Sequence, residues 1–462
     1  MIRKTWHRFR NTQALVLIFF SCVLAPHAQV QGSAASDFKF SDVDRQVLDE
    51  SNALDLQYVK KGLVLQDSAL QAYLDSVGKR VLGNRPIPEQ VQFKFRALRD
   101  PMVQAFALPN GSVYVTTGLL SLLENEAQLA AVLGHETAHV FERHSYLENR
   151  SARKKALTIN ILQIVASAAP VGPNFSQVVQ LYGAAVQLGA AIASDVLVAS
   201  VFGYSREMEH QADSDGLSAM TSASYDPAAM ARSFELLDED SKLEFEPFQG
   251  FYRDHPRLED RRTFALTYAS TNKVSQATIG SESDYLSKVS PAVCADIESD
   301  LNSRRERTAV NRATRLTSLF PDVPKYRVLL ADSYRSLGAK PKVPSDDERN
   351  RHGQAEHRKE YFSMTPQEEQ KKLLDKPDGP STLQENRNQA EGLYKSVLQA
   401  DPTYSQAHRG LGFLYEDEGK YAEAAAEYKA YLQMVAGTSI DYLRIEHRLA
   451  AMQKIGGLSV EH

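Results

Sequence analysis

The stretch LAAVLGHETAHV, residues 129–140, is the most informative part of this chain. It places His135 and His139 four positions apart, and on a helix this spacing puts both imidazoles on one face, about one turn apart. Two ligands of one tetrahedral zinc ion need this arrangement. The apolar residues around the pair predict an amphipathic helix with a buried side. The alternative is a helix that carries two unrelated histidines.

Glu136 lies between the two histidines. On the helix it can reach the position that a catalytic zinc leaves open, where a carboxylate can take a proton from water. We therefore expect one Zn²⁺ per chain, held in part by His135 and His139, with Glu136 as the general base of a hydrolase.

The third ligand is expected from residues 205–213, which read SREMEHQAD. Glu209 and Asp213 are four positions apart, so on a helix they share a face. Glu209 can bind the zinc, while Asp213 can reach back and hold a ligand histidine, because metal-bound imidazoles usually donate their other N–H to a carboxylate. Taken alone, this spacing is typical of a solvated helical face, and its value comes from following the first motif.

The region around the motif predicts an α+β fold, mostly helical with a small sheet. Apolar residues recur with helical spacing over residues 42–82, and a strand is expected over residues 91–98. Two short strands are expected over residues 106–115, around the turn at residues 109–111. A long helix should then run from residue 118 past residue 144.

The N-terminus predicts a signal peptide over residues 1–35. Basic residues precede an apolar run from Ala14 to Leu24, which is too short to span a bilayer comfortably, and small residues follow. Export to a periplasm is the expected localisation. The alternatives are an uncleaved membrane anchor and lipid attachment at Cys22. Cleavage would leave Cys294 as the lone cysteine, which excludes an internal disulfide.

Four segments are predicted in all: the signal peptide, a peptidase domain over 36–270, a linker and connecting helix over 271–310, and repeats over 311–462. The repeats rest on a period of 34 that relates Ala390 and Tyr394 to Ala424 and Tyr428. This period is typical of the tetratricopeptide repeat, with a generic helical bundle as the alternative. A charged, proline-rich stretch over 340–380 is expected to be a polar insertion.

Residues 156–203 are the most apolar part of the chain after the N-terminus. They predict a buried or amphipathic helical hairpin, because Asp195 would be costly at the centre of a membrane span. The alternative is contact with a membrane surface. The formal net charge of -5 gives no basic footprint, so nucleic acid is not an expected partner.

These motifs resemble the metallopeptidases related to HtpX and to the CAAX prenyl protease, over roughly residues 42–270. In that family the second motif ends Glu-x-x-Ala-Asp, as residues 209–213 do here. Residues 105–111 are similar to the family's edge strand and following turn, and Arg143 with His144 is also family-like. One departure is Gln104, where relatives commonly have Asn.

The resemblance implies further site residues. A third motif is matched by His255, Pro256 and Arg261. His255 is expected either to cap the zinc as a fourth ligand or, with Arg261, to stabilise the oxyanion as a catalytic group. The alternative is a surface histidine in a turn before a helix. The edge strand can bind an extended substrate through main-chain hydrogen bonds, and an ordinary core hairpin is the alternative. The residues expected to form that strand are Ala105, Phe106, Ala107 and Leu108.

The arrangement of an export signal, a peptidase domain and C-terminal repeats is similar to that of the BepA-like periplasmic proteases, which act in quality control of outer-membrane proteins. The resemblance implies a zinc endopeptidase that cleaves misfolded or stalled envelope proteins. It also implies contact with the outer-membrane assembly machinery through the repeats. Two other functions stay open: a chaperone-like binding protein with a latent protease site, and a membrane-associated prenyl-protease-like peptidase.

Overall fold

The computed structural model describes residues 39–151, 204–240, 258–274, 277–339, 380–435, 437 and 439–455. It divides into two units, residues 1–45 and residues 46–462. In the first unit the described residues begin helix α2, where the Ser41 N–H donates a 2.7 Å hydrogen bond to the Asp44 carboxylate. The sheet, the candidate site and the repeat helices all belong to the second unit.

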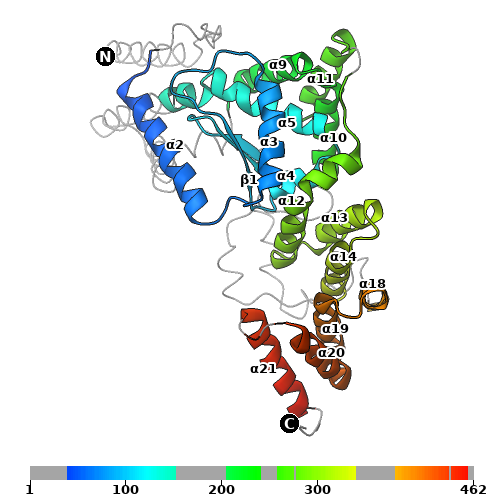
Figure 1. The fold of residues 1–462 in the computed structure, drawn as a ribbon. Coiled ribbons are helices and arrows are strands. Elements are labelled where there is room, and N and C mark those ends of the chain that lie inside the picture. The colour runs from blue at the N-terminus through cyan, green and yellow to red at the C-terminus, as the bar shows by residue number, and fades with distance from the viewer. Residues whose placement is uncertain are drawn as a thin grey trace, which may run out of the picture. The chain divides into compact units, whose positions relative to one another are not determined.

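The chain is mostly helical with one small sheet (Figure 1), as the sequence predicted. The elements up to residue 271 are α2 (Asp42–Lys60), α3 (Ser68–Leu82), β1 (Lys94–Leu98), β2 (Ala105–Ala107), β3 (Ser112–Thr116), α4 (Thr117–Leu122), α5 (Glu126–Phe141), α9 (Arg206–Ser222), α10 (Ala228–Asp240) and α11 (Leu258–Thr271). The later helices are α12 (Glu282–Asn302), α13 (Glu306–Leu319), α14 (Pro324–Leu337), α18 (Pro380–Ala400), α19 (Ser405–Asp417), α20 (Tyr421–Met434) and α21 (Ile440–Ile455).

The three strands pair in the order β1-β3-β2, with β1 parallel and β2 antiparallel to β3. The hairpin between β2 and β3 turns at Gly111, whose φ of 92° lies in the left-handed region that suits glycine. In this hairpin Phe106 pairs with Tyr114. The predicted strands are therefore present, although the first begins at Lys94. Strand β2 is an edge of this sheet, and all three of its residues are buried.

The prediction of a single long helix that runs past residue 144 is wrong, because the helical conformation is interrupted twice. Leu123 adopts an extended conformation after α4, and the Asn125 side chain then caps α5 by accepting a hydrogen bond from the Gln128 N–H. Helix α5 ends at Phe141, and Arg143 has a φ of 58°, which reverses the backbone direction.

One apolar core extends from the residues before α3 as far as Leu330 in α14. Helix α12 buries Tyr285, Val289 and Ile297 in it, so the segment predicted as a connecting helix is part of this core. The polar stretch before α12 is also attached to the domain, since Thr278 forms an isolated parallel bridge with Tyr225. The core therefore continues beyond residue 270, where the peptidase domain was predicted to end.

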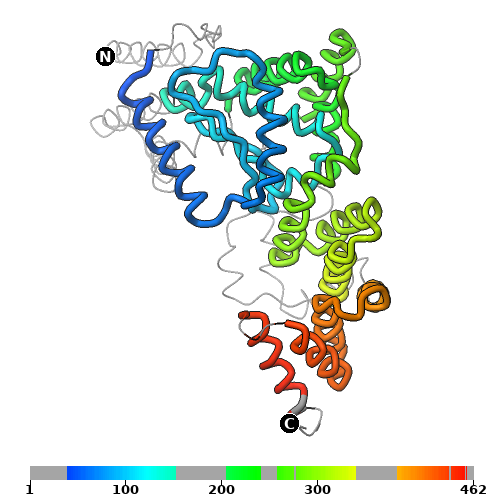
Figure 2. Tube along the Cα trace, viewed as in Figure 1, coloured from blue at the N-terminus to red at the C-terminus, as the bar shows by residue number. Residues whose placement is uncertain are grey.

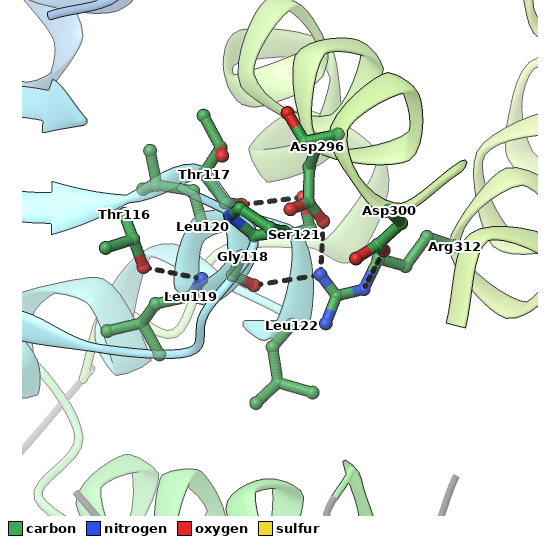
Figure 3. Close-up of polar contacts among 12 residues, drawn as sticks. Thr116, Thr117, Gly118, Leu119, Leu120, Ser121, Leu122, Asp296, Asp300 and Arg312 are labelled. Atoms are coloured by element: carbon green, nitrogen blue, oxygen red, sulfur yellow. Dashed lines mark hydrogen bonds and ion pairs between the residues drawn. The ribbon is translucent and has the colours of Figure 1, made fainter. Parts of the chain in front are cut away.

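A buried cluster of charged side chains from α12 and α13 contacts the N-terminal part of α4 (Figure 3). Arg312 of α13 donates a 3.2 Å hydrogen bond to the Gly118 carbonyl and pairs with Asp296 of α12. Its Nη2 lies 3.1 Å from Asp240 of α10, and its Nε lies 3.9 Å from Asp300. These contacts fix three helices against the segment that connects the sheet to α5.

The later helices form a second apolar core, which runs from Val328 to Met452. Figure 2 traces these helices one after another from α14 to α21. Tyr394 and Tyr428, which the period of 34 relates, are both fully buried. A Cβ placed on Gly412 would lie 2.3 Å from the Tyr428 ring, so glycine is needed for this close approach. Residues that the repeat period relates in the sequence are thus buried in the core of these helices.

Some predicted features lie outside the described residues: the signal peptide over 1–35 with Cys22, the apolar stretch over 156–203, the polar insertion except for residue 380 at its end, and His255. None of the helices in the described ranges has the length and apolar character that crossing a membrane requires.

Candidate metal centre

Helices α5 and α9 meet at a pair of glycines beside the first motif. A Cβ placed on Gly134 would lie 3.0 Å from the Gly216 carbonyl oxygen, and one on Gly216 would lie 2.9 Å from the His135 backbone nitrogen. Both distances are shorter than ordinary contacts, so only glycine at both positions lets the two backbones approach this closely. The crossing brings the residues of α9 to the histidines of α5.

Three side chains converge beside this crossing: His135 and His139 from α5, and Glu209 from the first turn of α9. Their candidate ligand atoms lie within 4.8 Å of one another, and all three residues are buried. The two Nε2 atoms are 3.0 Å apart. The Glu209 carboxylate oxygens lie 3.5 Å from Nε2 of His135 and 3.8 Å from Nε2 of His139. Two imidazole nitrogens and one carboxylate are donors that zinc accepts, so the residues fit the metal that the sequence predicts.

The Nδ1 side of the His135 ring contacts an ion pair formed by Asp213 and Arg261. Its Nδ1 lies 2.9 Å from Oδ1 of Asp213, one turn after Glu209 on α9. Arg261 of α11 grips the same carboxylate with two hydrogen bonds of 2.7 Å, from Nε and Nη2, and its guanidinium lies over the Phe234 ring. These contacts place Arg261 where it can position Asp213, and the oxyanion role expected from the resemblance stays a prediction.

His139 has a different neighbour behind it. Its Nδ1 lies 2.9 Å from Nδ1 of His144, and the Tyr204 ring stacks on the His139 ring with centroids 4.1 Å apart. The other nitrogen of His144 lies 3.4 Å from the Gln211 amide oxygen, and Gln211 donates a 2.6 Å hydrogen bond to Glu142.

Burial and charge set the pKa values of these groups. Burial lowers the pKa of His135, but the hydrogen bond to Asp213 and the charges of Asp213 and Glu209 together leave the pKa raised. For Asp213 burial raises the pKa, but the charge and hydrogen bonds of Arg261, together with the interaction with His135, bring the pKa well below the usual range. Burial raises the pKa of Glu209 and lowers that of His144 to about 4. Asp213 is therefore a carboxylate and His144 a neutral imidazole at neutral pH.

Glu136, the predicted base, is 1% exposed and follows His135 directly on α5. Strand β2 packs against the same helix, and among the described strands it pairs only with β3. The structure thus brings together the predicted ligands, Asp213 and Arg261, and places Glu136 and the edge strand on or against their helix. It does not describe His255.

No role was predicted from the sequence for Gly134 and Gly216. A glycine in a helix interior costs about 1 kcal/mol relative to alanine, so a glycine next to a ligand motif signals a packing requirement. No comparable signal pointed to Tyr204 or Gln211, because their role depends on how two distant helices meet.

Comparison with known proteins gives two family matches. The model of Peptidase family M48 matches residues 68–269, and a tetratricopeptide repeat model matches residues 382–444. These ranges contain the convergent ligand residues, helices α19 and α20, most of α18 and the first residues of α21.

Relatives match the same region. The mitochondrial metalloendopeptidase OMA1 of Schizosaccharomyces pombe is 34% identical over 167 residues, which cover 36% of this chain and 43% of that protein. The OMA1 protein of Arabidopsis thaliana is 28% identical over 226 residues, covering 49% of this chain and 41% of the relative. The beta-barrel assembly-enhancing protease of Escherichia coli is 27% identical over 229 residues, covering 49% and 44%.

The chain spans less than half the length of these curated relatives. Within that span, the family match, the relatives and the convergence of His135, His139 and Glu209 agree. Residues 68–269 are a Peptidase family M48 domain, and a tetratricopeptide repeat region follows it.

Proposed function

We propose that this chain is a zinc-dependent endopeptidase. The observation that carries the proposal is the convergence of His135, His139 and Glu209 at one buried point, directly beside Glu136. Such a set leaves one position of a tetrahedral metal open, which distinguishes a catalytic zinc site from a structural one.

The residues divide the work as follows. The two histidines and Glu209 hold the metal, and Asp213 with Arg261 keeps the His135 ring in place. When bound, zinc supplies Lewis-acid chemistry that activates water and polarises the scissile carbonyl. Glu136 accepts the proton of the attacking water and later delivers it to the leaving amine.

Substrate reaches this site in an extended conformation along β2. Residues Ala105–Ala107 pair with β3 on one side and pack against the helix that carries the motif. A peptide that adds to this edge would run past His135 and His139 through main-chain hydrogen bonds, with little dependence on its sequence.

Misfolded or stalled envelope proteins are the proposed substrates, and a periplasm is the proposed compartment. Support comes from the apolar run near the N-terminus and from the relatives named as beta-barrel assembly-enhancing proteases. The repeats are proposed to contact the assembly machinery, because stacked helical repeats form extended binding surfaces. His255, which precedes α11, stays a proposed fourth ligand or oxyanion donor.

Replacing the general base tests the mechanism. Glu136→Gln is expected to keep about one zinc per chain, because Glu136 is not a ligand, and to lower casein cleavage by roughly 100- to 10,000-fold. Metal content is measured by elemental analysis alongside the rate. The exposed Glu423→Gln in α20 serves as the control and should cleave like the parent. Normal cleavage by Glu136→Gln would remove the central claim.

A further inference from the structure

The two ligand histidines differ in the group that their Nδ1 atoms contact. The rear nitrogen of His135 faces the Asp213 carboxylate, a common arrangement in metal sites. The rear nitrogen of His139 faces another imidazole, with the two Nδ1 atoms 2.9 Å apart. This second imidazole belongs to His144, which is 1% exposed and to which the proposed mechanism gives no role.

The hydrogen positions along this contact can be worked out from the chemistry of each group. Nε2 of His139 faces the ligand cluster, so it carries no proton when the metal is bound, and the ring proton sits on Nδ1. His139 Nδ1–H therefore donates to Nδ1 of His144. That places the His144 proton on Nε2, which faces the amide oxygen of Gln211 at 3.4 Å. Gln211 in turn donates to the Glu142 carboxylate at 2.6 Å.

In this series of hydrogen bonds, which runs from His139 to Glu142, each group thus donates to the next. Only one assignment of protons satisfies all three contacts. The backbone conformation at Arg143 places His144 within reach of His139. Arg143 takes a φ of 58°, a backbone conformation that is unfavourable for a residue with a side chain. This reversal ends α5 and brings His144 back beside His139, and the next residue, Ser145, contacts the Tyr204 hydroxyl at 2.7 Å.

We propose that His144 is a positioning residue that accepts the Nδ1–H of His139 and thereby fixes the tautomer and ring orientation with which His139 binds the metal. This inference rests on the proposed zinc site. Its role differs from that of Asp213, because His144 is an uncharged acceptor whose own orientation is set by Gln211. Loss of such a partner typically weakens metal binding by about 10- to 100-fold.

The test compares three substitutions at position 144 in the purified full chain. Asparagine places an amide where Nδ1 of His144 lies, so it can still accept from His139. Glutamine extends its amide to the position of Nε2, and leucine offers no acceptor. We expect His144→Leu and His144→Gln to raise the Kd for zinc about 10- to 100-fold, measured by competition with a chelator, and His144→Asn to stay much closer to the parent.

Two further measurements separate positioning from general damage to the fold. The visible spectrum of the Co²⁺-substituted protein reports ligand geometry, and it should change in the leucine and glutamine variants and be restored in the asparagine variant. Thermal unfolding of the metal-free proteins shows whether each variant is folded. His447→Leu, an exposed histidine in α21, is the control and should match the parent.

Equal zinc Kd values and equal cobalt spectra for the asparagine and glutamine variants would overturn the proposal, even if the leucine variant does not fold. A parental Kd for His144→Leu would overturn it as well. If the parent itself binds no zinc, the proposed metal site fails, and that outcome is distinct from a failure of the role given to His144.

Discussion

At the scale of single residues, Arg261 shows how a side chain on a later helix sets a metal ligand. Its two hydrogen bonds of 2.7 Å hold the Asp213 carboxylate, which orients His135. The guanidinium presents both donors in a fixed plane, which a lysine ammonium cannot reproduce. Its charge also keeps Asp213 ionised in a buried position.

Arg261→Lys should therefore weaken zinc binding while Glu136 stays in place. We expect a Kd about 10-fold or more above that of the parent, measured by chelator competition. Arg262→Lys is the matched control on the same helix, because Arg262 pairs with Glu235 and Glu259 away from the metal site. Parental zinc affinity in Arg261→Lys would show that its grip on Asp213 is dispensable.

The local part of the candidate site follows from sequence spacing. His135, Glu136 and His139 lie within five residues, so helical spacing alone relates their side chains. The convergence of Glu209 and Asp213 on them was also anticipated. The role of Arg261 was not, because its partner depends on the packing of α11 against α9, which no spacing within one helix encodes.

At the scale of elements, the crossing of α5 and α9 decides whether a complete site exists. Two ligands come from α5 and one from α9, so a small change in the separation of the helices moves Glu209 away from the histidines. Gly134 and Gly216 set that separation, because a Cβ added at either position would lie about 3 Å from backbone atoms of the other helix.

Gly216→Ala is expected to force the helices apart. The added Cβ would lie 2.9 Å from a backbone atom, which cannot move aside as a side chain could. Overpacking of this kind costs about 1–3 kcal/mol, so both the free energy of unfolding and the zinc affinity should fall. Denaturant unfolding with and without zinc measures both effects.

Gly392→Ala provides the control for Gly216→Ala. Gly392 also lies inside a helix, α18, but a Cβ there would meet nothing within 4 Å. This substitution should be neutral or stabilise by up to about 1 kcal/mol. Equal stability and zinc affinity in the two variants would contradict the close-packing argument.

The elements themselves were predicted with one clear error. The hairpin at residues 109–111 and the helix around the motif followed from turn residues and apolar spacing. The breaks at Leu123 and Arg143 were missed, because neither residue disfavours a helix by its own propensity. Tertiary contacts, such as that between His144 and His139, override the local preference there.

At the scale of the whole chain, the core continues past the predicted domain boundary. Tyr285, Val289 and Ile297 of α12 lie in the same core as the residues around the motif. Sequence suggested a boundary near residue 270 because small polar residues become common there. That change of composition marks a surface turn, while the apolar stripe of α12 restores burial immediately afterwards.

A chain that ends at Ser283 should therefore fail to fold, since it loses the helices that complete this core. A chain that ends at Ala339 keeps α12 to α14 and should retain cooperative unfolding and about one zinc per chain. Circular dichroism during heating and elemental analysis distinguish the two. Cooperative unfolding with full zinc in the shorter chain would contradict this expectation and support the predicted boundary at 270.

The buried charge cluster predicts a pH dependence of stability. Burial and the Asp296 carboxylate raise the pKa of Asp300 above its ordinary value of 3.8. Above pH 4 the unfolded chain has released this proton and the folded chain retains it. Folding then takes up a proton, so this group lowers the free energy of unfolding as pH rises, by at most about 1.4 kcal/mol per pH unit for one proton.

Asp300→Asn removes that effect because asparagine carries no titrating proton. The free energy of unfolding of this variant, relative to the parent, should increase between pH 5 and pH 8 in denaturant titrations. The exposed Asp322→Asn is the control for loss of one carboxyl group. A difference between Asp300→Asn and the parent that stays constant or shrinks over this range would contradict the proposed proton uptake.

The helix crossing at Gly134 and Gly216 also has a consequence for the order in which the molecule matures. His135 and His139 are available as soon as α5 forms, but Glu209 arrives only when a segment far along the chain docks on it. Long-range docking is slow compared with helix formation. Tight metal capture is therefore expected to follow the docking of α9 on α5, and a newly made chain that holds zinc firmly has already formed this crossing.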